Sequence, residues 1–227
     1  TYADYLKLDQ LLSAQQPLSD LHDEMLFIVI HQTMELWMKQ MLHELNYAID
    51  LLGAGKHGES FKAMARMSRI QAVMTLAWDV LSTLTPVDYL KFRQVLGTSS
   101  GFQSAQFREL EFRLGLKEPA YVNHYPEGSS ERARLEAALA EPSLRDAAIA
   151  ALAAAGFEVG DRSADALAAA WLEVYRDSDR WFELYELAEE LVDIDDALAG
   201  WRHKHVLTVE RIIGNKTGTG GSAGASY

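Results

Sequence analysis

Residues 21–52 read LHDEMLFIVIHQTMELWMKQMLHELNYAIDLL, and this stretch decides the fold class. Its apolar side chains recur at three to seven residues, the spacing of one face of an α-helix. These side chains are Ile30, Trp37, Met41, Leu45, Ala48 and Leu52. Gly53, Gly55 and Gly58 follow, and such a glycine cluster predicts the end of a helix. The stretch therefore predicts one long helix.

The rest of the chain shows helical spacing that is interrupted by prolines and glycines. A second long helix is predicted from 59 to about 84. A short helix follows to about 96, because Thr85 suits an N-cap, Pro86 suits the first helical position and Asp88 completes a capping box. Further helices are predicted at 103–116, 131–140, 143–155, 163–175 and 177–213, with a loop at 117–130. The expected fold is all-α, a bundle of long antiparallel helices with a small helical insert.

Composition excludes several classes of partner. The formal net charge is -12, whereas a nucleic-acid binder needs a basic face. The same charge argues against an anionic membrane surface, and no apolar run is long enough for a membrane span. The chain has no cysteine, so disulfides, thiolate metal sites and covalent haem attachment are excluded. We expect a cytoplasmic protein with no nucleic-acid or membrane partner, in which any haem is bound non-covalently.

Two pairs of side chains four residues apart are candidate binding residues. Phe27 and His31 share a face of the first long helix, where they could hold an aromatic ligand with one hydrogen bond. Tyr89 and Arg93 have the same spacing on the short helix, and a phenol beside a guanidinium makes a good carboxylate clamp. Spacing alone favours ordinary core packing for the first pair, and the second pair is compatible with a packed Tyr beside a surface Arg.

Histidines are the natural haem or metal ligands in a chain without cysteine. His203 and His205 are two residues apart, so they point to nearly opposite sides of a helix and only one can face a buried cofactor. Periodicity does not choose between them. The glycine-rich segment 218–222 lacks the lysine of a phosphate loop, which favours a mobile lid over a ligand pocket, with a flexible linker as the alternative.

A set of strings distributed along the chain carries a family resemblance. They are 2–12 (YADYLKLDQLL), 22–33 (HDEMLFIVIHQT), 35–37 (ELW), 84–86 (LTP), Tyr89, 92–93 (FR), 99–104 (SSGFQS), 201–202 (WR), His205, 208–209 (TV), 211–214 (RIIG) and 218–222 (GTGGS). Together they resemble the tryptophan 2,3-dioxygenase family from end to end, least across about 117–175.

The resemblance implies a haem b whose iron is bound by a proximal histidine that matches His205, not His203. It also implies that His31 is a distal, catalytic histidine, hydrogen-bonded to the indole N–H of the substrate. The remaining implied roles are packing on the indole by Phe27, carboxylate binding by Tyr89 and Arg93, contact with the substrate ammonium and carboxylate by Thr219, and an edge of the haem pocket formed by Trp78, Ser100 and Gly101.

The implied reaction inserts both atoms of O2 across the indole C2–C3 bond of L-tryptophan, which gives N-formylkynurenine in the first step of the kynurenine pathway. Two features depart from the family: Met34 stands where Ser or Tyr is common, and the insert around 143–148 is richer in alanine. An alternative is a related haem oxygenase that acts on a modified tryptophan in specialised metabolism. A non-catalytic sensor is a further alternative, against which the retained clamp and His31 argue.

We expect one haem-dioxygenase domain over 1–227. The resemblance implies a homotetramer in which the N-terminal segment 1–20 packs on a neighbouring subunit and completes its pocket. The residues of that segment implied to bind substrate are Tyr2, Tyr5 and Leu6. Residues 117–175 are expected to form a variable helical insert and 214–227 a glycine-rich active-site loop, and we expect further sequence beyond Tyr227.

Overall fold

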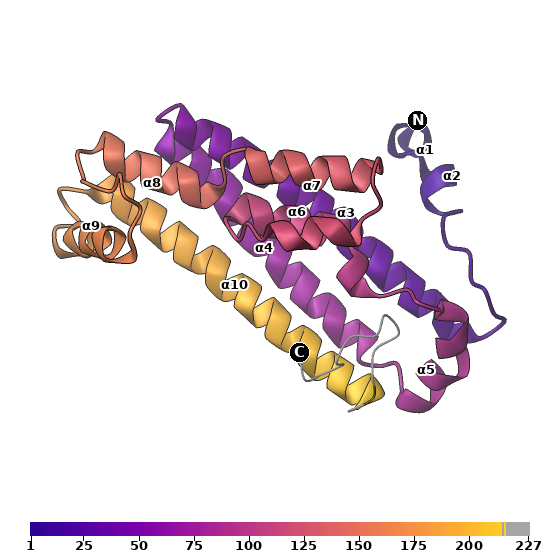
Figure 1. Ribbon diagram of the computed structural model, residues 1–227. Helices are drawn as coiled ribbons and strands as arrows, with labels where there is room; N and C mark the ends of the chain where they lie inside the picture. The colour runs from indigo at the N-terminus through magenta and orange to yellow at the C-terminus, as the bar shows by residue number, and fades with distance from the viewer. Residues whose placement is uncertain (215, 217–227) are drawn as a thin grey trace. The chain divides into compact units, whose positions relative to one another are not determined.

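The structure is a computed structural model that describes residues 1–214 and 216, and the elements of this described part are all helical (Figure 1). Three helices are long: α3 (His22–Gly53), α4 (His57–Leu81) and α10 (Phe182–Ile213). The shorter elements are α1 (Tyr2–Leu6), α2 (Leu8–Leu11), α5 (Pro86–Phe92), η1 (Arg93–Leu96), η2 (Gly101–Gln103), α6 (Ala105–Leu114), η3 (Pro119–His124), α7 (Ser130–Ala140), α8 (Leu144–Ala154) and α9 (Ala164–Arg176), where η marks a 3-10 helix. The all-α prediction is confirmed.

Most of the short helices begin at a side chain that caps them. The Thr85 hydroxyl accepts a hydrogen bond from the Asp88 backbone N–H at 3.2 Å, and Pro86 fills the first turn of α5, as the sequence predicts. Ser143 and Asp146 form a reciprocal capping box at the start of α8. The other serine caps are Ser104, Ser129 and Ser163. Caps therefore set the helix starts in the alanine-rich insert.

The chain forms two compact units, and each takes residues from α3, α4 and α10. Unit 1 consists of residues 1–36, 74–102 and the described residues from 202 onward, and unit 2 of 37–73 and 103–201. Every described residue that the sequence marks as a candidate for the site lies in unit 1. The single domain over 1–227 stays a prediction.

Unit 2 combines an apolar core with ion pairs between helices. α6 packs against α7 over a cluster that consists of Phe112, Val122, Tyr125, Leu135 and Ala138. Arg66 on α4 donates to both carboxylate oxygens of the buried Glu44 on α3, at 2.6 and 2.7 Å. The Gln71 side chain donates to the Ile194 carbonyl on α10 at 3.3 Å. These contacts hold α4 between its two long neighbours within unit 2.

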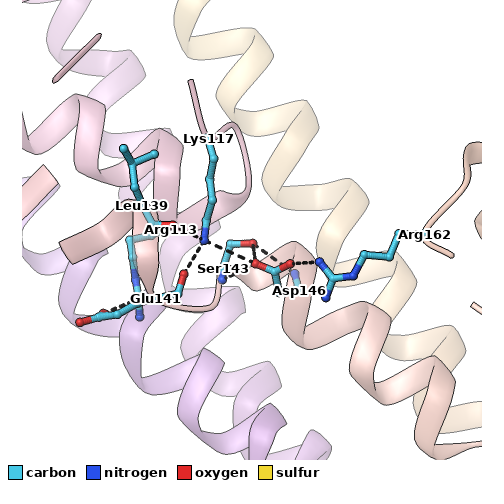
Figure 2. Close-up of polar contacts among 7 residues, drawn as sticks. All are labelled: Arg113, Lys117, Leu139, Glu141, Ser143, Asp146 and Arg162. Atoms are coloured by element: carbon cyan, nitrogen blue, oxygen red, sulfur yellow. Dashed lines mark hydrogen bonds and ion pairs between the residues drawn. The ribbon is translucent and has the colours of Figure 1, made fainter. Parts of the chain in front are cut away.

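The Asp146 carboxylate is the centre of a polar network at the start of α8 (Figure 2). It accepts hydrogen bonds from the Ser143 backbone N–H at 2.9 Å, the Ser143 hydroxyl at 2.6 Å and Arg162 at 2.5 Å. Lys117 lies 3.7 Å from it and also donates to backbone carbonyls at the end of α7. Burial raises the pKa of Asp146, but the hydrogen bonds and Lys117 outweigh it and hold the pKa below the ordinary 3.8.

Unit 1 joins the first part of α3, the last part of α4, α5 and the end of α10. Two polar contacts tie α10 to the end of α4: Lys204 Nζ lies 2.5 Å from Asp79 Oδ1, and Arg211 Nε donates to the Ser82 carbonyl at 2.8 Å. In this unit α4 and α10 run in the same direction, because the residue numbers of both partners increase from the first contact to the second. The described residues of the candidate site belong to this unit.

Some elements differ from the sequence-based expectation. The N-terminal helices α1 and α2 were not expected, because they bury no residue and show no apolar periodicity. α10 begins at Phe182 instead of 177, and the loop 117–130 contains the 3-10 helix η3. Among the residues described, no single helix is long and apolar enough to cross a membrane, although α4 and residues 86–96, with an 89° bend between them, pass that test as a pair.

Candidate active site

Phe27 and His31 lie one turn apart on α3, and their rings meet with centroids 4.2 Å apart. Their predicted shared face is therefore confirmed. The Nδ1 atom of His31 lies 2.7 Å from the Phe27 carbonyl oxygen. A carbonyl oxygen can only accept, so Nδ1 donates and carries the proton. In neutral His31 the other ring nitrogen, Nε2, is then left as a hydrogen-bond acceptor.

The surroundings of His31 favour this neutral form. Burial lowers its pKa below the ordinary 6.5, and this effect exceeds the opposing effects of the Phe27 carbonyl and the Glu35 carboxylate. At neutral pH the imidazole is therefore uncharged and presents an acceptor at Nε2. A neutral imidazole with an acceptor at Nε2 suits an aromatic ligand whose ring carries one N–H donor.

Tyr89 and Phe92 project from α5 toward the same ring cluster. Tyr89 is buried, with its ring centroid 6.0 Å from that of Phe27. Phe92 is fully buried and packs edge-on against both, at 5.8 Å from Phe27 and 5.5 Å from Tyr89. Burial raises the pKa of Tyr89, with Arg93 as a smaller opposing influence, so the phenol stays protonated and can donate a hydrogen bond.

Arg93 stands at the junction of α5 and the 3-10 helix η1 and is half-buried. It follows Tyr89 by one turn, and its charge acts on the Tyr89 phenol, so the two groups are electrostatic neighbours. Since Thr85 and Pro86 fix the start of α5, they also fix the direction in which this pair projects. The pair offers a cation and a hydroxyl to an anionic group, as a carboxylate clamp requires.

His205 on α10 meets Trp78 on α4, with ring centroids 4.8 Å apart. Trp78 is buried and also lies edge-on to His31, at 6.5 Å. Burial lowers the pKa of His205, and His31 lowers it further. His203, two residues away, is exposed. Of the two histidines that the sequence leaves open, only His205 therefore faces the ring cluster.

These contacts bring together three side chains from three different helices: the neutral imidazoles of His31 and His205 and the buried indole of Trp78. A neutral histidine imidazole in such an aromatic, half-buried setting is a suitable protein ligand for haem iron. His205 could therefore hold a haem iron, whereas the exposed His203 is not placed to do so. The donor set is compatible with a haem in unit 1.

Other predicted site residues lie outside this cluster or outside the described chain. Ser100 is half-buried, with its hydroxyl 3.4 Å from the Phe102 backbone N–H, and Gly101 is exposed at the start of η2. The α1 residues Tyr2, Tyr5 and Leu6 are exposed. Thr219 lies outside the described residues, as does most of the predicted glycine-rich loop. The roles of these residues stay predictions.

Phe92 is the site residue that sequence reasoning missed. It belongs to a matching string, but no role follows from that string, and its spacing of three from Tyr89 gives only a weak signal. Its importance appears in the structure, where one fully buried ring supports both Phe27 and Tyr89.

Known proteins match this chain over its whole length. The family model described as Tryptophan 2,3-dioxygenase matches residues 1–163 and 158–227. A relative of that name from Caulobacter vibrioides is 58% identical over 238 residues, which cover 100% of this chain and 90% of the relative. Relatives of the same name from Bacillus cereus and Polaromonas sp. are 53% and 50% identical, and the matches cover 100% of this chain and 85% and 81% of theirs. This chain belongs to the tryptophan 2,3-dioxygenase family.

Proposed function

We propose that this protein is a haem-dependent dioxygenase of L-tryptophan. It adds both atoms of O2 across the C2–C3 bond of the indole, which breaks that bond and gives N-formylkynurenine with no other product. The name shared by the relatives supports the reaction. The single structural observation that carries the assignment is the cluster of His31, Trp78 and His205 in unit 1.

His205 is the residue that would hold the haem iron. Its depressed pKa keeps the imidazole neutral and able to bind iron at neutral pH. A bound haem b supplies the iron that binds and activates O2. Trp78 packs against the His205 ring and restricts its rotation, and we propose that Ser100 and Gly101 contribute to the edge of the same pocket.

The substrate is held at its two ends. Arg93 and the protonated Tyr89 bind the carboxylate, which orients the amino acid. Phe27 packs on the indole ring. His31 accepts a hydrogen bond from the indole N–H at Nε2, because Nδ1 already donates to the Phe27 carbonyl. Together these contacts favour an α-amino acid that carries an N–H donor, and they exclude water from the indole. We further propose that Thr219 contacts the substrate ammonium and carboxylate.

An oxygenase acting on a modified tryptophan receives no support from the relatives, whose names all give tryptophan. The homotetramer, in which Tyr2, Tyr5 and Leu6 would complete the pocket of a neighbouring subunit, remains a proposal. The cytoplasmic location is likewise a prediction.

Two histidine variants test the assignment with a matched pair. We expect His205→Ala to abolish stoichiometric haem binding, and the neighbouring exposed His203→Ala to leave it unchanged. Haem-loaded wild-type protein supplied with L-tryptophan and isotopically heavy O2 should yield N-formylkynurenine that contains both heavy oxygen atoms. Full haem binding by His205→Ala would refute the ligand assignment, and a product with one heavy oxygen atom would refute the dioxygenase.

A further inference from the structure

We call the line of contact between α4 and α10 in unit 1 the seam. An ion pair lies on this seam beside the ring contact between His205 and Trp78. Lys204 precedes His205, and Asp79 follows Trp78. Lys204 Nζ and Asp79 Oδ1 are 2.5 Å apart. Adjacent residues on a helix point about 100° apart, so the ion pair and the ring pair occupy neighbouring positions on the same seam.

The two contacts differ in exposure. The Asp79 and Lys204 side chains are 55% and 34% exposed, whereas Trp78 is buried. The ion pair therefore lies on the solvent side of the seam and the ring pair on its interior side. A second polar tie, from Arg211 to the Ser82 carbonyl, crosses the same two helices two turns further along α10.

We propose that Asp79 and Lys204 are positioning residues that set the rotation of α10 and thereby aim the His205 imidazole. The inference rests on the proposed role of His205 as axial ligand. A rotation of α10 about its axis would part Lys204 from Asp79 and turn His205 away from Trp78 at the same time. Because the pair is exposed, breaking it should cost the fold little stability, and its main effect should be on the fit of the ligand.

Four variants of the full-length protein test the proposal. Asp79→Asn and Lys204→Met each break the pair, and the double variant Asp79→Lys with Lys204→Asp restores it in reverse. The control is Glu59→Gln, which removes one charge from the other end of α4, where Glu59 pairs with Lys56 at similar exposure, 60% and 55%.

The first readout is the rate at which each haem-loaded variant loses haem to an excess of apomyoglobin. We expect each single variant to lose haem about two- to fivefold faster than wild type, the range an exposed ion pair supports. The reversed pair should return to within about twofold of wild type. Added salt should speed haem loss from wild type more than from Asp79→Asn, because an exposed pair is screened.

The second readout separates positioning from stability. The iron–histidine stretching band of the ferrous protein should shift in Asp79→Asn and return in the reversed pair, while urea unfolding of the haem-free variants matches that of Glu59→Gln. Haem loss and a stretching band like those of Glu59→Gln would overturn the proposal, as would a loss of stability that accounts for faster haem loss. Full haem binding by His205→Ala would instead overturn the ligand assignment on which the proposal rests.

Discussion

Removal of the His31 acceptor should weaken the binding of tryptophan by an amount set by one hydrogen bond. The change is His31→Ala. With Nδ1 bound to the Phe27 carbonyl, Nε2 is the only acceptor that His31 offers. The neighbouring side chains of Phe27 and Trp78 offer none, because Phe has no polar atom and an indole N–H only donates. A buried indole N–H left unsatisfied costs about 1–3 kcal/mol, or roughly 5- to 150-fold in affinity.

The assay compares two ligands in a thermodynamic cycle. Equilibrium binding of L-tryptophan and of its analogue with sulfur in place of the indole nitrogen is followed through the absorption of the ferric haem protein. Wild type should prefer tryptophan, and His31→Ala should reduce that preference by the factor above. The control His43→Ala removes an exposed histidine of α3 and should behave as wild type. An equal loss for both ligands in His31→Ala would refute the hydrogen bond to the indole nitrogen.

Four further outcomes follow from the geometry. Burial lowers the His31 pKa below the ordinary 6.5. Affinity for tryptophan should therefore be constant at pH values well above 6.5 and fall at lower pH, as protonation removes the Nε2 acceptor, whereas the sulfur analogue should not show this fall. Arg93→Lys replaces a planar fork with a point charge and should weaken tryptophan binding about tenfold in an equilibrium titration. Phe92→Leu should lower the free energy of unfolding by about 1–2 kcal/mol in urea and raise the KM for tryptophan more than it lowers kcat, because it loosens Phe27. Asp146→Asn should lower the free energy of unfolding by about 1–2 kcal/mol at pH 7; because the folded pKa of Asp146 is depressed, the difference from wild type should shrink as pH falls below 3.8.

Controls or contradicting results distinguish these outcomes from indirect effects. Tryptamine lacks the carboxylate, so Arg93→Lys should leave its binding unchanged, and an equal loss for both ligands would contradict the clamp. Asp165→Asn changes an exposed acidic residue in the first turn of α9 and should alter stability less than Asp146→Asn. A pH-independent difference between Asp146→Asn and wild type would show that the carboxylate charge is not what stabilises α8. For Phe92, a fall in kcat alone would argue against a role in supporting Phe27.

The fold was largely readable from the sequence because its signals are local. The apolar face of residues 21–52 and the following glycines predict α3 to within one residue at each end. Thr85, Pro86 and Asp88 predict the start of α5 for the same reason, since a cap acts within one turn. The N-terminal helices could not be predicted in this way, because no side chain of α1 or α2 is buried and apolar spacing carries no information there.

Spacing could pair site residues only where the partners lie about one helical turn apart in the sequence. Phe27 with His31, and Tyr89 with Arg93, are four residues apart, so spacing alone pairs them. The choice of His205 over His203 depends on Trp78, more than a hundred positions away along the chain, and helical periodicity does not reveal it. The support that Phe92 gives to Phe27 also comes from a residue distant in the sequence.

The hydrogen bond between His31 Nδ1 and the Phe27 carbonyl also gives the site a spectroscopic marker. A ring proton shared with a backbone oxygen at 2.7 Å inside a helix exchanges slowly with water and resonates far downfield in a proton NMR spectrum. Histidines labelled with nitrogen-15 would distinguish this signal from those of exposed rings such as His43 and His203. The integrity of the proposed indole-binding site could thus be followed in haem-free protein, during refolding or across a library of variants, before any turnover is measured.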